Sequence, residues 1–341
     1  MKVQLSLLPD LVEETLDPID AIKSRQLPDW PIVVSFGAGT NSTALIIASR
    51  LKRQPIDCIL FADTGNEHPA TYRFLEYFDE WLQKPWYLGD EVYPSMPGIT
   101  VVKKAPGKPG HRKKLEALLV KEFCQIKPLM NPKIFYSVWF PGWVLKACIE
   151  LHFVGETLGE DALIKQRLPS KAYGYGACSV EWKIRVMEKF IKAEYCSQEV
   201  VQFIGIHADE PGRLFDRKGK LKPTETDMGI VHYPLIADGL NQDECLKLCA
   251  FALGANTPRK SSCWFCPNAK VHEVRELAKE YPEYYELGCF MEEQNARNKP
   301  ENSTVVGLGR SFAWSDLELL SESEQLQIDS IKSHMQCSCT D

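Results

Sequence analysis

The sequence lacks the features that mark several large classes of protein. It contains no run of the ~18–20 apolar residues that a membrane-spanning helix needs, and its acidic N-terminal segment has no apolar stretch typical of a secretory signal. We therefore expect a cytoplasmic protein with no membrane partner. No period of 20–50 residues recurs, which argues against a solenoid or a propeller. Because 46 Asp and Glu outnumber 40 Lys and Arg, the net charge of −6 excludes a globally basic nucleic-acid binder.

The composition that remains is that of a folded globular protein. The chain has 341 residues, of which 44% are hydrophobic and 25% are charged. This is enough for one large domain or two ordinary ones. In a reducing compartment the 12 cysteines are expected to be thiols, metal ligands or redox groups rather than structural disulfides.

From Pro31 onward, apolar runs alternate with helical periodicity. Residues 32–36 and 58–62 are continuous apolar runs, typical of strands buried on both faces. Helical patterns follow them at 43–51 and 69–83, and this alternation predicts parallel strands. Further strands are expected at 99–102, 200–206 and 230–235, and a helix from Val180 to about Tyr195. The predicted fold class is α/β, a Rossmann-like open parallel sheet of about five strands with a helical, cysteine-rich C-terminal region.

The same patterns divide the chain into four parts. Residues 1–30 form an acidic N-terminal extension, and residues 31–240 form the α/β domain. That domain carries an insertion at about 103–175, which is too long for a plain crossover connection. Residues 241–314 form the helical, cysteine-rich region, and residues 315–341 form a C-terminal tail with an acidic helix.

A glycine-containing loop joins the first predicted strand to the first predicted helix. Its residues are Ser35, Phe36, Gly37, Ala38, Gly39, Thr40, Asn41, Ser42 and Thr43. Loops at the carboxyl ends of parallel strands are where such sheets bind ligands, and glycines, hydroxyls and a helix N-terminus together suit a phosphate. The loop is neither a Walker A nor a Gly-x-Gly-x-x-Gly loop. It predicts a phosphate site, with a turn that binds nothing as the alternative, and the prediction requires an accessible loop with free amides.

The loop resembles the pyrophosphate loop (PP-loop) of the adenine-nucleotide α-hydrolase superfamily. Phe61–Pro69 resembles the DTG-x-E-x-x-x-T signature of its phosphoadenosine-phosphosulfate (PAPS) reductase-like branch, and Cys178–Lys183 and Gly205–Arg213 also fit. The matched pieces extend over roughly three-quarters of the chain. The sequence departs from the pattern at Asn41, where the family has an acidic residue, and at His207, where an arginine is usual.

The resemblance implies an enzyme that binds ATP with Mg²⁺ and cleaves the bond between the α- and β-phosphates. The nucleotide would contact the glycine loop together with Asp63, Thr64 and Gly65 at the end of the second strand. Asp63, Lys183 and Arg213 are the catalytic candidates, with Asp63 facing adenosine or a metal and the two cations holding phosphate or substrate charge. The alternatives are a helix cap for Asp63 and solvated surface positions for Lys183 and Arg213.

Four cysteines are candidate metal ligands. Cys263 and Cys266 form a Cys-x-x-Cys pair, which alone fits a redox pair, half of a metal site or coincidence. Four thiolates close a zinc or iron–sulfur site. The resemblance makes Cys178 a third ligand and Cys289 the natural fourth ligand of a [4Fe–4S] cluster. Zinc, an open iron with three protein ligands, and buried thiols without a metal remain open.

Three other features bear on the reaction and on partners. Cys245 and Cys249 lie one helical turn apart among apolar residues, which favours core packing. Cys337 and Cys339 lie near the C-terminus, where PAPS reductases carry a catalytic cysteine, but the surrounding motif is not reproduced. Lys103–Lys114 is rich in Lys and Arg and contains no acidic residue. This segment suits a tRNA or DNA backbone, with a solvated loop as the alternative.

Three functions therefore remain open. The first is an ATP-dependent adenylating enzyme that inserts sulfur into a nucleic acid or nucleotide. It would resemble the DNA phosphorothioation sulfurtransferases and use a sulfur donor such as a cysteine desulfurase. The second is a sulfonucleotide (PAPS or adenylyl sulfate) reductase with an electron donor. The third is a non-catalytic nucleotide-binding module of a modification or defence system.

Overall fold

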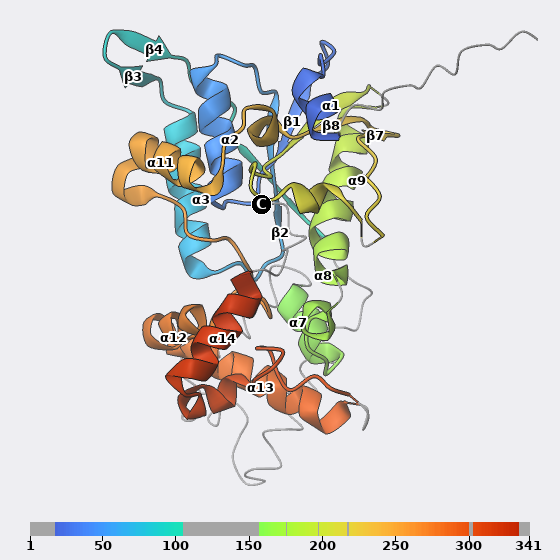
Figure 1. Cartoon of the computed structure of the whole chain (residues 1–341), viewed down its shortest axis with the longest axis vertical. Coiled ribbons are helices and arrows are strands. Elements are labelled where there is room, and N and C mark those ends of the chain that lie inside the picture. Colours follow the sequence, from blue (N-terminus) through green and yellow to red (C-terminus); the bar gives the residue numbers. More distant parts are fainter. Residues whose placement is uncertain are drawn as a thin grey trace, which may run out of the picture.

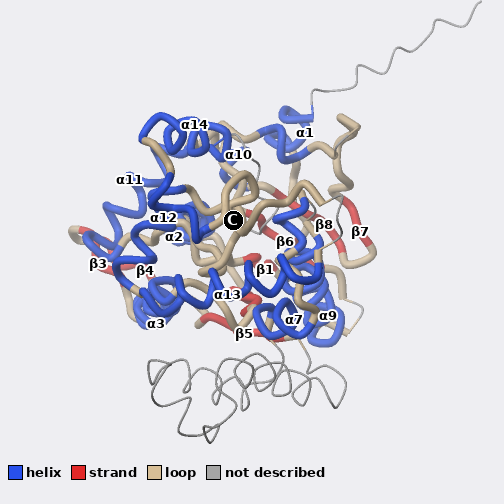
Figure 2. Tube along the Cα trace, turned by 90° about the horizontal axis from the view of Figure 1, so that it is seen from below, coloured by secondary structure: helices blue, strands red, loops and turns tan. Residues whose placement is uncertain are grey.

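A six-stranded sheet forms the centre of the computed structural model, which describes residues 18–104, 157–174, 176–196, 198–216, 218–299 and 303–333. The spatial order of the strands is β5-β2-β1-β6-β8-β7, which can be followed in Figure 2. Their bounds are β1 Ile32–Ser35, β2 Cys58–Asp63, β5 Ile99–Lys103, β6 Val200–Ile204, β7 Glu225–Thr226 and β8 Gly229–His232. All pairings are parallel except that of β7 with β8. The α/β class is confirmed and is compatible with a Rossmann-like fold, and the sheet has one short antiparallel edge strand beyond the five parallel ones.

Helices cover both faces of the sheet (Figure 1). On one face lie α2 (Thr40–Leu51), α3 (Pro69–Leu82) and α11 (Gln242–Leu253), whose apolar side chains share a core with Val34 and Phe61. On the other face, α9 (Arg185–Glu194) packs against Val33 and Leu60. Every residue of β1 and β2 is buried, which explains why their sequences read as unbroken apolar runs rather than alternating ones.

The strand order reverses between β1 and β6. Chain connections leave these two strands in opposite directions along the sheet, so the loops at their carboxyl ends diverge and leave room for a ligand. The glycine loop follows β1 and the segment beginning at Gly205 follows β6. The sequence motifs therefore lie at the point where open α/β sheets bind their ligands.

A second core lies in the helical part below the carboxyl edge of the sheet in Figure 1. It is built from Trp182, Phe265, Trp314 and their neighbours. The elements that contribute are α7 Leu158–Ile164, η1 Ser170–Tyr173, η2 Val180–Ile184, α12 Val271–Glu280, α13 Pro282–Asn298 and η5 Trp314–Leu319. Part of the predicted insertion thus shares its core with the C-terminal helices.

The remaining elements are short or peripheral. They are α1 Pro18–Ser24, the hairpin β3 Trp86–Leu88 with β4 Glu91–Tyr93, α8 Ala177–Ser179, η3 Pro211–Leu214, α10 Pro234–Ala237, η4 Gly254–Asn256 and α14 Glu322–Ser333. The strand predicted at 230–235 ends at His232, because Pro234 begins α10 instead. None of the helices described is long and apolar enough to cross a membrane.

Cys245 and Cys249 lie in the sheet core, as the sequence predicts. Both thiols are 0% exposed, and burial raises the pKa of each to about 12. Their helix, α11, packs on α2. The first helix of the predicted cysteine-rich region is therefore part of the sheet's own covering layer.

Candidate functional site

The glycine loop is a tight turn between β1 and α2. The Phe36 N–H donates to the carbonyl oxygen of Leu60 on β2 (2.9 Å), and the Gly37 N–H donates to Oγ of Ser42 (3.2 Å). Ala38 has a φ of 61°, a conformation that residues other than glycine seldom adopt. Such turns can aim successive N–H groups toward one side and form an anion-binding hollow. Two of the loop's amides are nevertheless already engaged by protein atoms.

The next amides have no acceptor among the described residues. The Thr43 N–H makes the first bond of α2, to the carbonyl of Gly39 (3.1 Å), whereas the five amides from Ala38 to Ser42 bond to nothing described. In addition, Asn41 Oδ1 and Thr43 Oγ1 are buried and have no hydrogen-bond partner in the described part of the chain. Nearly all buried polar groups in folded proteins are partnered. This concentration of unpartnered atoms therefore fits a polar ligand that the protein atoms do not replace.

The loop itself is buried, contrary to the accessible loop that the sequence interpretation requires. Ala38 is 2% exposed. Gly205, just after β6, lies so close to α2 that a Cβ on it would be 2.9 Å from the Ser42 nitrogen. Within residues 32–50, all of which are described, Thr40 is the residue that is not buried. A ligand that reaches the inner amides must enter beside Thr40 or displace the residues that cover the loop.

Thr40 lines a cavity of about 410 Å³, which we call the Thr40 cavity. Most of its lining residues come from the first turns of α2 and α3 on one side, and from α12 and residues 258–269 on the other. Arg259 and Lys260 lie in its wall, and both are paired with carboxylates. Arg259 lies 3.7 Å from Glu276, and Lys260 lies 3.1 Å from Glu273. The cavity therefore adjoins the glycine loop, but its cations are already neutralised.

Asp63, at the end of β2, is fully occupied by its neighbours. Its Oδ1 accepts hydrogen bonds from the Gly65 N–H (2.7 Å) and the Tyr72 hydroxyl (2.7 Å), and its Oδ2 lies 3.0 Å from Lys103 Nζ. Burial, with the Asp63 carboxylate next, raises the pKa of Tyr72, so the phenol remains a donor. The carboxylate shapes the loop after β2, and it could bind a ligand or a metal ion after Lys103 leaves Oδ2.

A buried polar cluster, which the sequence analysis did not single out, contains Glu67. Glu67 Oε1 accepts from Lys183 Nζ (3.2 Å) and from the Thr64 hydroxyl (2.9 Å), and that hydroxyl contacts Cys263 Sγ at 3.3 Å. The side chains of Glu67 and Lys183 are 0% and 6% exposed. Burial, and then the Glu67 carboxylate, raises the pKa of the Cys263 thiol well above its usual range. Cys263 is therefore a protonated thiol in this environment.

Main-chain contacts hold this cluster together. Glu67 and Cys263 are β-bridge partners, and the His68 N–H donates to the carbonyl of Ser262 (2.9 Å). Lys183 enters from the other face of the sheet through the π-helical turn η2, a distortion that is frequent at functional sites. The position of Glu67 within Phe61–Pro69, the segment quoted in the sequence analysis, was the signal available in the sequence. Its pairing with Lys183 is a long-range contact that no local pattern reveals.

Arg213 and Lys183 are not solvated surface residues. Arg213 is 8% exposed, and its Nη1 lies 2.8 Å from Glu210 Oε2. His207 Nε2 lies 3.5 Å from the same carboxylate oxygen. Burial lowers the pKa of His207 although Glu210 opposes the shift, which favours a neutral imidazole. Both predicted cationic catalytic residues are thus held by carboxylates.

The structure does not gather the four predicted cysteine ligands into a metal site. Cys178 lies in α8, Cys263 and Cys266 precede α12, and Cys289 lies in α13. In the described ranges no three His, Cys, Asp or Glu side chains lie close enough to hold a metal ion. Burial, and then Glu292, raises the pKa of Cys289 to about 11. A [4Fe–4S] cluster or zinc at these thiols stays a prediction, and we derive no chemistry through either.

Some predicted residues lie outside the described part of the chain. Of the basic segment Lys103–Lys114, Lys103 and Lys104 are described and the rest is not. Cys337 and Cys339 also lie outside the described ranges. The predicted roles of these residues in nucleic-acid binding and in sulfonucleotide reduction stay predictions.

No protein-family model matches the chain, and comparisons with curated proteins and with solved structures find no match either. The fold and the site define the protein at a coarser level. It is an α/β protein with a mostly parallel six-stranded sheet and, where the strand order reverses, a glycine loop rich in unpartnered polar atoms.

Proposed function

We propose that the protein binds ATP with its phosphates at the glycine loop and transfers the adenylyl group to a second substrate, releasing pyrophosphate. The observation that supports this most is the run of five amides from Ala38 to Ser42, with the Thr43 hydroxyl beside them, without partners among the described residues. Phosphate oxygens are the acceptors that a helix N-terminus binds best. The position of the loop at the reversal of strand order supports the same ligand.

The chemistry that this site could perform is stabilisation of a leaving group. A nucleophile on the acceptor attacks the α-phosphorus, and the bond from that phosphorus to the oxygen bridging to the β-phosphate breaks. Negative charge then develops on pyrophosphate, where pre-oriented N–H groups stabilise it without reorganising. Magnesium, when bound, supplies further charge neutralisation at the phosphates. Asp63 is the candidate protein ligand, and most of the ion's coordination would come from phosphate and water oxygens.

The burial of the loop adds a conformational requirement to the proposal. Binding must open the contact between Gly205 and the start of α2 or admit the phosphates beside Thr40. Backbone amide hydrogen exchange across Ala38–Ser42 measures this directly, because amides bonded to phosphate become protected. Sulfur insertion into a nucleic acid or nucleotide is the finer part of the proposal and rests on the sequence resemblance alone.

The test uses the full chain, ATP labelled at the α-phosphate and magnesium. We expect ATP to protect the amides of Ala38–Ser42 from exchange and, with an acceptor, to yield pyrophosphate with AMP or an adenylylated product. Thr43→Val should weaken ATP binding, whereas Thr304→Val, at an exposed position, should not. ADP as the product would exclude the reaction. ATP binding without turnover would favour the non-catalytic module, and no binding at millimolar ATP would exclude the site.

A further inference from the structure

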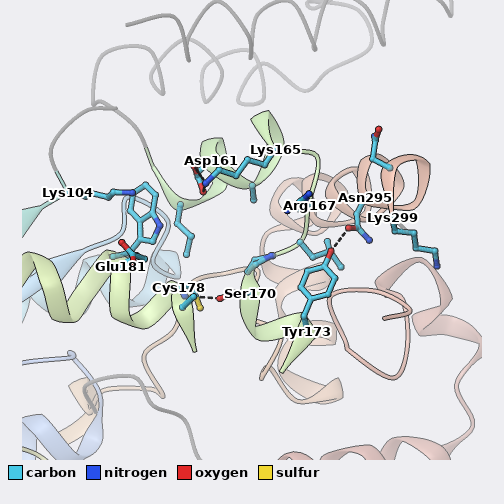
Figure 3. A pocket seen from close by; sticks show the side chains of 17 residues that line it. Lys104, Asp161, Lys165, Arg167, Ser170, Tyr173, Cys178, Glu181, Asn295 and Lys299 are labelled. Carbon is cyan, nitrogen blue, oxygen red and sulfur yellow. Dashed lines mark hydrogen bonds and ion pairs between the residues drawn. The ribbon is translucent and has the colours of Figure 1, made fainter. Parts of the chain in front are cut away.

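A second and larger cavity has a volume of about 620 Å³ (Figure 3). We call it the Arg167 cavity. Its walls come from α7, η1, α8, η2 and the end of α13, with Lys104 beyond the end of β5. The volume lies within the range of pockets that hold small organic ligands. Neither the glycine loop nor the Thr40 cavity shares a lining residue with it.

The walls of this cavity carry a surplus of positive charge. Lys104, Arg167 and Lys299 line it, and none of them lies within ion-pairing distance of a carboxylate among the described residues. The two carboxylates in the wall are already engaged. Asp161 lies 2.7 Å from Lys165, and Glu181 pairs with Arg185. An anion entering the cavity therefore meets three cations whose charge no described carboxylate cancels.

A buried polar side chain adds to these cations. Asn295 is 2% exposed and lines the cavity. Its Oδ1 accepts from the Tyr173 hydroxyl (2.6 Å), and its amide nitrogen donates to no described residue. Figure 3 shows Asn295 with Arg167 and Lys299 toward one end of the cavity and Lys104 toward the other. A fixed amide donor beside a guanidinium suits the oxygens of a phosphate.

We propose that the Arg167 cavity is a second anion site, which binds the phosphate ester of a nucleotide or of a nucleic-acid end. Arg167, Lys299 and the Asn295 amide hold the phosphate. The apolar residues of the wall, among them Leu158 and Leu168, contact the organic group. This part of the proposal does not depend on ATP binding at the glycine loop.

The role of this site as the acceptor site rests on the proposed function. Lys104 follows Lys103, which contacts Asp63, and Trp182 in the wall precedes Lys183, which contacts Glu67. The cavity therefore adjoins the residues at the carboxyl edge of β2. An acceptor bound there would lie next to the edge at which the nucleotide is proposed to bind.

Calorimetric titration of the full chain with thymidine 5′-monophosphate and with a 5′-phosphorylated oligothymidylate tests the site. We expect Arg167→Gln with Lys299→Gln to weaken binding at least about tenfold, the usual scale for lost charge-assisted bonds. The control, Lys189→Gln with Lys279→Gln, removes two charges from exposed positions outside the cavity and should change affinity less than about twofold.

The two probes separate the sources of the phosphate. A loss for the mononucleotide supports a free nucleotide, and a loss for the oligonucleotide alone supports a nucleic-acid end. Unchanged binding in the double variant, or no binding of either probe to the unmodified protein at millimolar concentration, overturns the proposal. Thr43→Val should leave thymidine monophosphate binding intact, so failure of the ATP site and failure of this site are distinguishable.

Discussion

The Thr40 cavity and the Arg167 cavity are each lined by a sequence neighbour of the buried Glu67–Lys183 pair, but they differ in how their charges are balanced. His68, next to Glu67, lines the first, and Trp182, next to Lys183, lines the second. Both have cationic walls. In the Thr40 cavity carboxylates pair with Arg259 and Lys260. In the Arg167 cavity the acids are paired, and among the described residues three of the cations pair with no carboxylate. Charge balance, more than the number of cations, should decide where an anion binds.

The largest effect is expected at the buried Glu67–Lys183 pair. Glu67→Ala leaves the Lys183 ammonium buried without its carboxylate, and removing one partner of a buried pair costs about 3–5 kcal/mol of unfolding free energy. Urea unfolding followed by circular dichroism measures this loss. Glu199→Ala, at an exposed site, is the control and should change stability by less than about 0.5 kcal/mol. If both changes lower the free energy of unfolding by a similar, small amount, the Glu67–Lys183 pair does not stabilise the fold.

The next effect concerns the contact that closes the glycine loop. A Cβ at Gly205 would lie 2.9 Å from the Ser42 nitrogen, against backbone that cannot turn aside. We expect Gly205→Val to cost about 1–3 kcal/mol of stability and to abolish ATP binding, with Gly205→Ala intermediate in both. Thermal unfolding and equilibrium dialysis with ATP measure the two effects. Phosphate-ester binding in the Arg167 cavity should survive, and its loss together with ATP binding would mean that the two sites are one.

Much of this architecture could be predicted from local patterns. Residues 32–36 and 58–62 are buried on both faces and therefore read as apolar runs, and the helix after each run shows its own periodicity. The chemistry of the sites depends on contacts between distant segments. The partner of Lys183 and the cover that Gly205 places over α2 arise only when the sheet assembles.

The cysteines also show that local sequence patterns do not reveal contacts between distant segments. Their spacing in the chain suits a metal site, but the spacing says nothing of whether separate segments bring the thiols together. Cys178, Cys263 and Cys289 border one helical core, yet no metal-binding group is found among the described residues. Burial and then the Glu67 carboxylate raise the pKa of the Cys263 thiol, and the sequence pattern includes neither cause.

Two threonines near the buried pair and the glycine loop should respond in opposite ways. The Thr64 hydroxyl donates to Glu67, so Thr64→Val should cost about 1.5–3 kcal/mol, the value of a bond to a charged group. The Thr43 hydroxyl is buried and has no hydrogen-bond partner among the residues that the structure describes, so Thr43→Val should leave stability unchanged or raise it. Thermal unfolding compares the two. Equal destabilisation would show that the Thr43 hydroxyl has a hydrogen-bond partner in the protein without ligand. The Thr43 hydroxyl would then no longer support a ligand at the glycine loop.

The smallest effect is a gain of binding in the Thr40 cavity. Glu273→Gln removes the carboxylate that lies 3.1 Å from Lys260, while the glutamine can still cap the first turn of α12 through its side-chain oxygen. Loss of this carboxylate should then raise the affinity of the Thr40 cavity for inorganic tripolyphosphate by roughly two- to fivefold, since an exposed charge contributes about 0.2–1 kcal/mol. Calorimetry at low salt measures the gain. The matched control is Glu293→Gln, which removes an exposed carboxylate that pairs with Arg297 on α13, and neither of these two residues lines either cavity. If Glu273→Gln brings no gain over this control, pairing is not what keeps anions out of the Thr40 cavity. The contrast between the two cavities would then have to come from their shape.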